Sequence, residues 1–85
     1  MDRPANIAQA VGFQIREQRG MRNINLSQMA QAMGYSDSGW SRLETGRTVM
    51  TVIQLVKACR FLECSPWRVF QLAEMALDLA GKPGT

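Results

Sequence analysis

Four residues in the middle of the chain carry hydrogen-bonding side chains at a spacing that suits one face of a helix. They are Asp37, Ser38, Ser41 and Arg42, which lie three and four positions apart. The fork of an arginine fits O6 and N7 of guanine, and hydroxyl groups can bind the edge of any base. We therefore interpret these four residues as candidate readers of base pairs in the major groove of DNA.

Two of these residues have alternative roles. The carboxylate of Asp37 can accept a hydrogen bond from N4 of cytosine, but an acid in the first turn also stabilises a helix by about 0.3–1 kcal/mol without any DNA. Arg42 can bind a base, bind a phosphate or remain solvated. The sequence leaves these alternatives open.

Two short helices joined by a glycine turn would position the polar face. The first is predicted over about 26–33, and Gly34 follows where the chain needs a left-handed conformation. Ser36 offers its hydroxyl as the N-cap of a second helix over about 37–44, and Gly46 ends that helix. The apolar face of the first helix consists of Met29, Ala30 and Met33.

Trp40 and Leu43 lie on the other side of the second helix from the polar residues. We expect both to face the core. The alternative for Trp40 is an exposed platform on which bases stack. The core is favoured because a buried aromatic ring contributes a large apolar area to packing.

Three further helices are predicted: one over about 4–21, one that begins after Thr51, and one over about 66–80, before a frayed tail at 81–85. The apolar stripe of the first is Ile7, Ala8, Val11 and Ile15; that of the fourth is Val52, Leu55, Val56, Cys59 and Leu62. No strand pattern persists between turn residues, so the prediction is all-α. The chain of 85 residues is expected to form one domain.

The composition limits the classes of function. Hydrophobic residues make up 46% and charged residues 20%, and no apolar run approaches the ~20 residues that a membrane span needs. The N-terminus does not resemble a signal peptide, so we expect a cytoplasmic protein. The net charge of +3 is too small for a uniformly basic surface, so any DNA affinity must come from how the charges are distributed.

The chain lacks the residues of common catalytic and metal sites. It contains no histidine, and the spacing of Cys59 and Cys64 fits neither a redox pair nor a zinc site. No nucleophile lies beside an activating base. We therefore expect no metal, no cofactor and no enzymatic activity.

Several segments together resemble a known family. They are IREQR at 15–19, the spacing from Ala30 to Gly34, SRLETGR at 41–47 and QLVKACRFLECSPWRVF at 54–70. With them the chain resembles the lambda-repressor-like, Cro/Xre-type helix-turn-helix domains of bacterial and phage transcription regulators, over about residues 11–70. The resemblance implies five helices, with the helix-turn-helix at the second and third.

The register of the second helix follows from this resemblance. The string Leu-Ser-Gln at 26–28 imitates the usual start of that helix but lies two residues too late. Ile24 and Asn25 instead take the places of the family's leucine and serine, so Asn25 is the expected N-cap and Gln28 completes a capping box. Leu26 then replaces a glutamine that in relatives commonly helps to hold the DNA backbone.

The resemblance also implies roles for residues outside the polar face. The residues expected to contact the DNA backbone are Asn25, Ser36, Arg47 and Thr48. Arg19 and Glu44 correspond to an arginine and a glutamate that form an ion pair between the first and third helices. This pair is therefore expected to be structural and not to contact bases. It indicates a fixed geometry more than net stability, because desolvation offsets much of its attraction.

The fifth helix carries more apolar residues than one packed face needs. These residues predict a symmetric homodimer joined through Phe70, Leu72, Ala73, Met75, Ala76, Leu77 and Leu79. The alternative is a helix buried within its own domain.

Together these features predict a regulator of transcription that binds double-stranded DNA sequence-specifically. The simplest version is a repressor that binds an inverted-repeat operator as a homodimer. One alternative is an antitoxin, which would also bind a toxin partner. The other is a protein-interaction module that has lost DNA binding.

Overall fold

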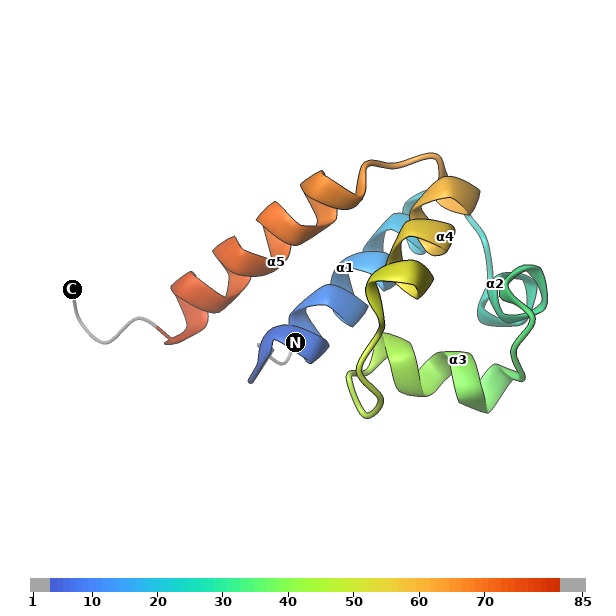
Figure 1. Ribbon diagram of the computed structural model, residues 1–85, viewed down its shortest axis with the longest axis horizontal. Helices are drawn as coiled ribbons and strands as arrows, with labels where there is room; N and C mark the ends of the chain where they lie inside the picture. Colours follow the sequence, from blue (N-terminus) through green and yellow to red (C-terminus); the bar gives the residue numbers. More distant parts are fainter. Residues whose placement is uncertain (1–3, 82–85) are drawn as a thin grey trace.

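The structure, a computed structural model, describes residues 4–81 of the 85-residue chain, with side chains for residues 4–78. It contains five helices (Figure 1): α1 (Ile7–Met21), α2 (Leu26–Met33), α3 (Asp37–Glu44), α4 (Val52–Leu62) and α5 (Pro66–Gly81). Between residues 4 and 81 there is no strand. The predicted all-α, five-helix architecture is confirmed.

α1 lies at the centre of the arrangement. α5 runs antiparallel beside it, and α1 also packs against α3 and α4 (Figure 1). α3 packs mainly against α1 and α2 and lies at the lower edge of the molecule in this view. α3 therefore packs against the rest of the domain with one of its sides.

The helix boundaries agree with the predictions except at the start of α1 and at Gly81, which was predicted to lie in a frayed tail and instead ends α5; the rest of that predicted tail, 82–85, lies outside the described residues. α1 begins at Ile7 instead of near Pro4, because Asn6 has an extended backbone and accepts a hydrogen bond from the N–H of Gln9 at 3.0 Å. The Asn6 side chain therefore caps the helix two residues after the proline. Among the helices of residues 4–81, none has the length and apolar character required to cross a bilayer.

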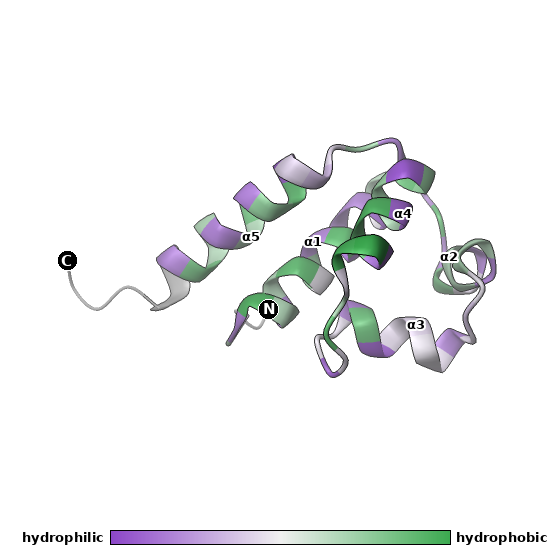
Figure 2. Cartoon of the chain, in the orientation of Figure 1, coloured by the Kyte–Doolittle hydropathy of each residue, from purple (hydrophilic) through white to green (hydrophobic). Residues whose placement is uncertain are grey.

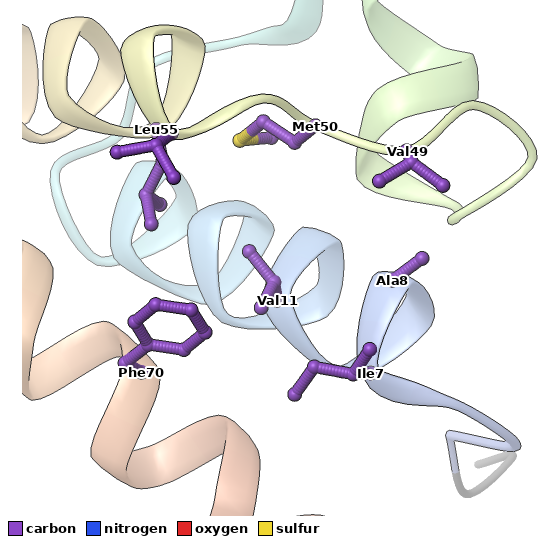
Figure 3. A pocket seen from close by; sticks show the side chains of 8 residues that line it. Ile7, Ala8, Val11, Val49, Met50, Leu55 and Phe70 are labelled. Atoms are coloured by element: carbon purple, nitrogen blue, oxygen red, sulfur yellow. The ribbon is translucent and has the colours of Figure 1, made fainter.

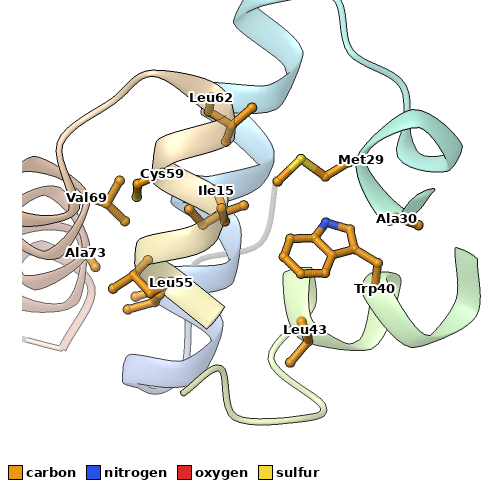
Figure 4. Packing of buried hydrophobic residues seen from close by; sticks show 13 residues of the cluster. Ile15, Met29, Ala30, Trp40, Leu43, Leu55, Cys59, Leu62, Val69 and Ala73 are labelled. Carbon is orange, nitrogen blue, oxygen red and sulfur yellow. The ribbon is translucent and has the colours of Figure 1, made fainter. Parts of the chain in front are cut away.

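The buried side chains form one cluster to which all five helices contribute (Figure 4). Trp40 is completely buried at the contact of α3 with α2, so the core interpretation of this residue is confirmed. Two residues of the predicted apolar stripes are instead exposed: Val52 by 68% and Ile7 by 45%. Each lies in the first turn of its helix and belongs neither to the buried cluster nor to the partly buried residues packed against it.

Two free cysteines lie at the end of α4. Cys59 is buried and Cys64 is half-buried, and the N–H of Cys64 donates to the carbonyl oxygen of Cys59 at 2.9 Å, as in a Schellman cap. Burial, and next the neighbouring Cys64, raise the pKa of the Cys59 thiol to about 12. At neutral pH Cys59 is therefore an uncharged core residue.

Candidate nucleic-acid interface

The turn between α2 and α3 has the geometry that the sequence predicts. Gly34 adopts a left-handed conformation with φ of 78°, and the N–H of Tyr35 donates to the carbonyl oxygen of Ala30 at 2.8 Å. The hydroxyl of Ser36 then accepts a hydrogen bond from the N–H of Gly39 at 3.1 Å and starts α3. The predicted helix-turn-helix is therefore confirmed.

The outward face of α3 carries the predicted base-reading residues. Asp37, Ser38 and Arg42 are exposed, and Ser41 is half-buried. One polar concavity is lined by Ser38, Ser41, Arg42, Thr45 and Arg47. Its lining contains two guanidinium groups, three hydroxyl groups and no acid, so the surface can bind the acceptor-rich edges of bases and phosphate oxygens.

Thr45 is a residue of this concavity that the sequence analysis missed. It is exposed, and its hydroxyl donates to the carbonyl oxygen of Ser41 at 2.9 Å. Its position four residues after Ser41 continues the spacing of the polar face, so the signal was present in the sequence. The same carbonyl oxygen also accepts from the N–H of Thr45 at 2.9 Å, so the hydroxyl adds a second hydrogen bond to it at the end of α3.

Asp37 differs from the other predicted readers because it already has a partner. The hydroxyl of Ser27, in the first turn of α2, donates to Oδ2 of Asp37, in the first turn of α3. The contact ties the two helix starts together. It favours the helix-stabilising role of Asp37 over the reading of cytosine.

The start of α2 contains the expected capping box. Oδ1 of Asn25 accepts from the N–H of Gln28 at 2.8 Å, and Oε1 of Gln28 accepts from the N–H of Asn25 at 2.9 Å. Leu26 is half-buried and packs against the core, so it does not take over the DNA contact of the glutamine that it replaces. The register deduced for this helix is therefore confirmed, and the polar groups left for a phosphate are the Asn25 amide and the N–H groups of the first turn.

The predicted backbone-contacting residues near α3 have different surroundings. The hydroxyl oxygen of Ser36 already accepts the capping hydrogen bond from the N–H of Gly39, at 3.1 Å. Arg47 and Thr48 are exposed after the end of α3, and the N–H of Thr48 donates to the carbonyl oxygen of Arg42 at 3.1 Å. This bond folds the loop back against the helix and places Arg47 in the same concavity as Arg42.

The carboxylate of Glu44 holds α3 to the rest of the domain. Arg19 donates through Nε to Oε2 at 2.8 Å and through Nη2 to Oε1 at 2.9 Å. Trp40 Nε1 also donates to Oε2, at 2.7 Å, and Arg19 Nη1 donates to the carbonyl oxygen of Ile24 at 2.9 Å. The structure thus contains the Arg19–Glu44 pair that the resemblance implies, and it adds Trp40, whose spacing of four residues from Glu44 was visible in the sequence.

Two glycines allow α3 and the following loop to lie very close to α1. A Cβ atom at Gly12 would lie 2.4 Å from the carbonyl oxygen of Leu43 and 2.5 Å from that of Glu44. A Cβ atom at Gly46, which has a φ of 78°, would lie 2.6 Å from Cα of Gln9. The C-terminal end of α3 is therefore fixed by backbone contacts as well as by the Glu44 carboxylate.

The predicted dimer face on α5 needs correction. Ala73 is completely buried and Leu77 packs against the core, because α5 lies along α1 with the stripe that includes Val69 and Ala73 turned inward. These residues cannot form an outward face. The remaining predicted members are Phe70 and Met75, which are exposed, Leu72 and Ala76, which are half-buried, and Leu79, whose side chain lies outside the described residues.

Comparison with known proteins agrees with this geometry. No curated protein matches the sequence. Two crystal structures of the clp gene regulator ClgR from Corynebacterium glutamicum are similar to this chain at 26% identity, with TM-scores of 0.82 and 0.84. The first similarity covers 87% of this chain and 96% of the matched ClgR chain, and the second covers 93% of this chain and 83% of the matched ClgR chain.

A family match covers most of the chain. Residues 10–69 match the helix-turn-helix domain family, a range that contains the whole of α2, α3 and the turn between them. The expected resemblance to lambda-repressor-like helix-turn-helix domains is thereby confirmed. The chain belongs to the helix-turn-helix domain family.

Proposed function

We propose that this chain is a sequence-specific regulator of transcription that places α3 in the major groove of DNA. The observation that carries the proposal is the two-sided character of α3. Its inner side is anchored by the buried Trp40, Leu43 and Glu44, whereas its outer side lines a concavity of hydroxyl and guanidinium groups. Such a rigid helix with a free polar face fits the groove that admits an α-helix.

The surroundings of each residue suggest its role on DNA. Arg42, an exposed residue of the concavity, is the base reader that distinguishes guanine, because the fork of its guanidinium fits O6 and N7 of that base. The hydroxyls of Ser38 and Thr45 lie beside it on the same concavity and accept or donate to neighbouring bases. Arg47, at the start of the loop, binds a phosphate and contributes affinity without sequence preference.

A second set of phosphate contacts lies at the start of α2. The N–H groups of its first turn, with the amide of Asn25, form a site for an anion at the positive end of the helix. Ser36 and Thr48 complete the proposed contacts with the backbone on either side of α3. These contacts would hold α3 in one register while its side chains read the sequence.

The proposed assembly is a homodimer on an inverted repeat. Two copies of α3 then enter successive major grooves about 34 Å apart, and the number of phosphate contacts doubles. ClgR is a regulator of clp genes, which supports regulation of genes by this chain as well. Repression through occupation of the operator is the simplest outcome, since it requires only DNA binding.

Selection from a random pool of duplex DNA tests the proposal. We expect enrichment of a palindromic sequence whose half-sites are centred about ten base pairs apart, and a mobility shift with the selected duplex that weakens as salt rises. The control is the Arg42→Ala variant in the same selection, which should lose the preference at one base pair of each half-site. Failure of the wild-type protein to bind any duplex at low salt would reject the function.

One observation favours a second candidate, a protein-interaction module. The Asp37 carboxylate lies against Ser27 at the start of α2, so a negative charge stands beside the site proposed for a phosphate. Asp37→Asn separates the two candidates. If the protein binds DNA, removal of the charge should strengthen binding to all duplexes, whereas a module without DNA affinity would gain nothing.

A further inference from the structure

Gln54 is a polar residue at an otherwise apolar helix start, and both ends of its side-chain amide are hydrogen-bonded. The other residues of 52–56 are valine, isoleucine and leucine, and this part of α4 is strongly hydrophobic in Figure 2. Oε1 of Gln54 accepts from the N–H of Thr51 at 2.8 Å, as the capping box of α4 requires. Nε2 donates to the hydroxyl of Tyr35, in the turn between α2 and α3. The cap does not need this second bond, which joins residues 19 positions apart in the sequence.

Tyr35 connects the Gln54 side chain to α3. The N–H of Tyr35 closes the turn by its bond to the carbonyl oxygen of Ala30, at 2.8 Å. Its ring lies against Trp40, with the ring centroids 5.6 Å apart and the planes tilted by 58°. Trp40 is completely buried and donates to the carboxylate of Glu44 at 2.7 Å. The turn before α3 and the inner side of α3 are therefore linked to α4 through one phenol.

Thr51 connects the same Gln54 side chain to the loop between α3 and α4. This α3–α4 loop, residues 45–51, carries Arg47 and Thr48, which we propose as contacts of the DNA backbone. The N–H of Thr48 bonds the first part of the loop to α3, and the N–H of Thr51 bonds its end to Gln54. The loop is thus held by a backbone hydrogen bond at each end.

The middle of the α3–α4 loop makes apolar contacts. Val49 and Met50 line an apolar groove of about 170 Å³ together with residues of α1, α4 and α5 (Figure 3). Val49 is 70% exposed, and Val52, at the rim of the groove, is exposed as well. Apolar contacts have no preferred direction. The hydrogen bonds at its two ends therefore fix the course of the loop more closely than this groove does.

We propose that Tyr35 and Gln54 are positioning residues that keep the base-reading face of α3 in register with the α3–α4 loop. One side chain, Gln54, is bonded both to the turn that precedes α3 and to the end of the loop that follows it. The inference rests on the proposed DNA-binding function and adds a determinant of its specificity. Base and phosphate contacts must form together on a specific site, whereas phosphate contacts alone suffice on random DNA. Tyr35 and Gln54 therefore raise sequence specificity without touching a base.

Tyr35→Phe tests the proposal with the smallest change. It removes the hydroxyl and keeps the ring that lies against Trp40. The matched control is Gln71→Ala, which removes another exposed hydrogen bond between side chains, that of Arg68 with Gln71 on α5. Both variants should unfold at nearly the urea concentration of the wild type, because water replaces the partner of an exposed group.

The measurement is the ratio of two dissociation constants, that for random duplex DNA divided by that for the selected duplex, at one salt concentration. We expect Tyr35→Phe to lower this ratio by about threefold to tenfold, the factor by which the net contribution of one hydrogen bond changes an equilibrium. Gln71→Ala should leave the ratio unchanged. An unchanged ratio in Tyr35→Phe would overturn the proposal. Equal weakening on both duplexes would also overturn it, because the hydroxyl would then bind a phosphate directly.

Variants of Gln54 provide the rescue and the test of coupling. Gln54→Glu keeps an acceptor for the N–H of Thr51 and offers its second oxygen to the hydroxyl proton of Tyr35. Its added charge should weaken binding to every duplex, but the ratio should stay near the wild-type value. Gln54→Ala should lower the ratio at least as much as Tyr35→Phe, and the double variant should lower it no further. Additive losses, or no rescue by Gln54→Glu, would count against the proposal.

Amide hydrogen exchange without DNA separates this inference from the proposed function. Loss of the Tyr35 hydroxyl frees the Gln54 amide, so the N–H of Thr51 should exchange about threefold to tenfold faster in Tyr35→Phe. Unchanged exchange and an unchanged ratio in a protein that binds the selected duplex would reject the positioning role and leave the function standing. A wild type that binds no duplex would reject the function and the role in specificity, and faster exchange would then support only the coupling of the loop to the turn.

Discussion

Gly12 and Gly20 are both in α1, and the same substitution at the two positions should change stability in opposite directions. A methyl group at Gly12 would lie 2.4 Å from the carbonyl oxygen of Leu43, 2.5 Å from that of Glu44 and 2.8 Å from the Glu44 carbonyl carbon. An ordinary contact begins at 3.4 Å, so the end of α3 must move by about 1 Å. At Gly20, by contrast, the methyl group would meet nothing within 4 Å.

The magnitude follows from two opposing terms. Replacing a helical glycine by alanine stabilises a protein by about 1 kcal/mol. Overpacking costs about 1–3 kcal/mol, and the upper end applies here because the obstacle is backbone and not a flexible side chain. We expect Gly12→Ala to lower the free energy of unfolding by about 1–2 kcal/mol and Gly20→Ala to raise it by up to about 1 kcal/mol.

Urea unfolding followed by circular dichroism at 222 nm measures both values, at one protein concentration because dimerisation would contribute to stability. Gly12→Ala should also weaken binding to the selected duplex, since the displaced end of α3 carries Thr45 and precedes Arg47. The reasoning would be refuted if Gly12→Ala were as stable as Gly20→Ala. It would also be refuted if Gly12→Ala lost stability but bound DNA with unchanged affinity.

Three further outcomes are expected. Arg42→Ala should lose about 1–3 kcal/mol of binding free energy concentrated at one base pair, whereas Arg47→Ala should weaken all sequences alike and lower the salt slope by about one; equal losses across all sites would reject base reading by Arg42. Trp40→Phe should cost about 2–4 kcal/mol of stability in urea unfolding, because it removes ring volume and the hydrogen bond to Glu44, and an unchanged unfolding midpoint would argue against that contact. Iodoacetamide at pH 8 should modify Cys64 in the native protein and Cys59 only after unfolding, because burial raises the pKa of Cys59 to about 12; mass spectrometry showing equal native rates would contradict this.

Local signals in the sequence were sufficient for the helices and for the order of the elements. The cap of α2 at Asn25, the left-handed Gly34 and the cap of α3 at Ser36 each depend on hydrogen bonds between residues no more than four or five positions apart. Such contacts are encoded in short segments, so periodicity and capping rules recover them. The start of α1 was misplaced because Pro4 and Asn6 are both acceptable near a helix start, and the cap decided between them.

Family resemblance supplied what local rules could not. The pairing of Arg19 with Glu44 spans 25 residues, and no spacing rule predicts it. The register of α2 likewise followed from the resemblance, which gave Ile24 and Asn25 the places of the family's leucine and serine despite the misleading Leu-Ser-Gln string at 26–28. The polar face of α3 was found from its helical spacing alone, although its last member, Thr45, was overlooked.

The tertiary structure alone decided which apolar residues are covered. Ala73 and Met75 are both apolar residues of α5, yet Ala73 faces α1 and is buried while Met75 is 50% exposed. Val52 belongs to the apolar stripe of α4 by sequence but stands at the rim of the groove. Whether an apolar side chain is buried depends on which other helix packs against it, and that helix is usually distant in the sequence. The sequence by itself therefore determined the helices and the face of α3, whereas the position of Gly12 against α3, the engagement of Asp37 by Ser27 and the apolar groove arise only from packing.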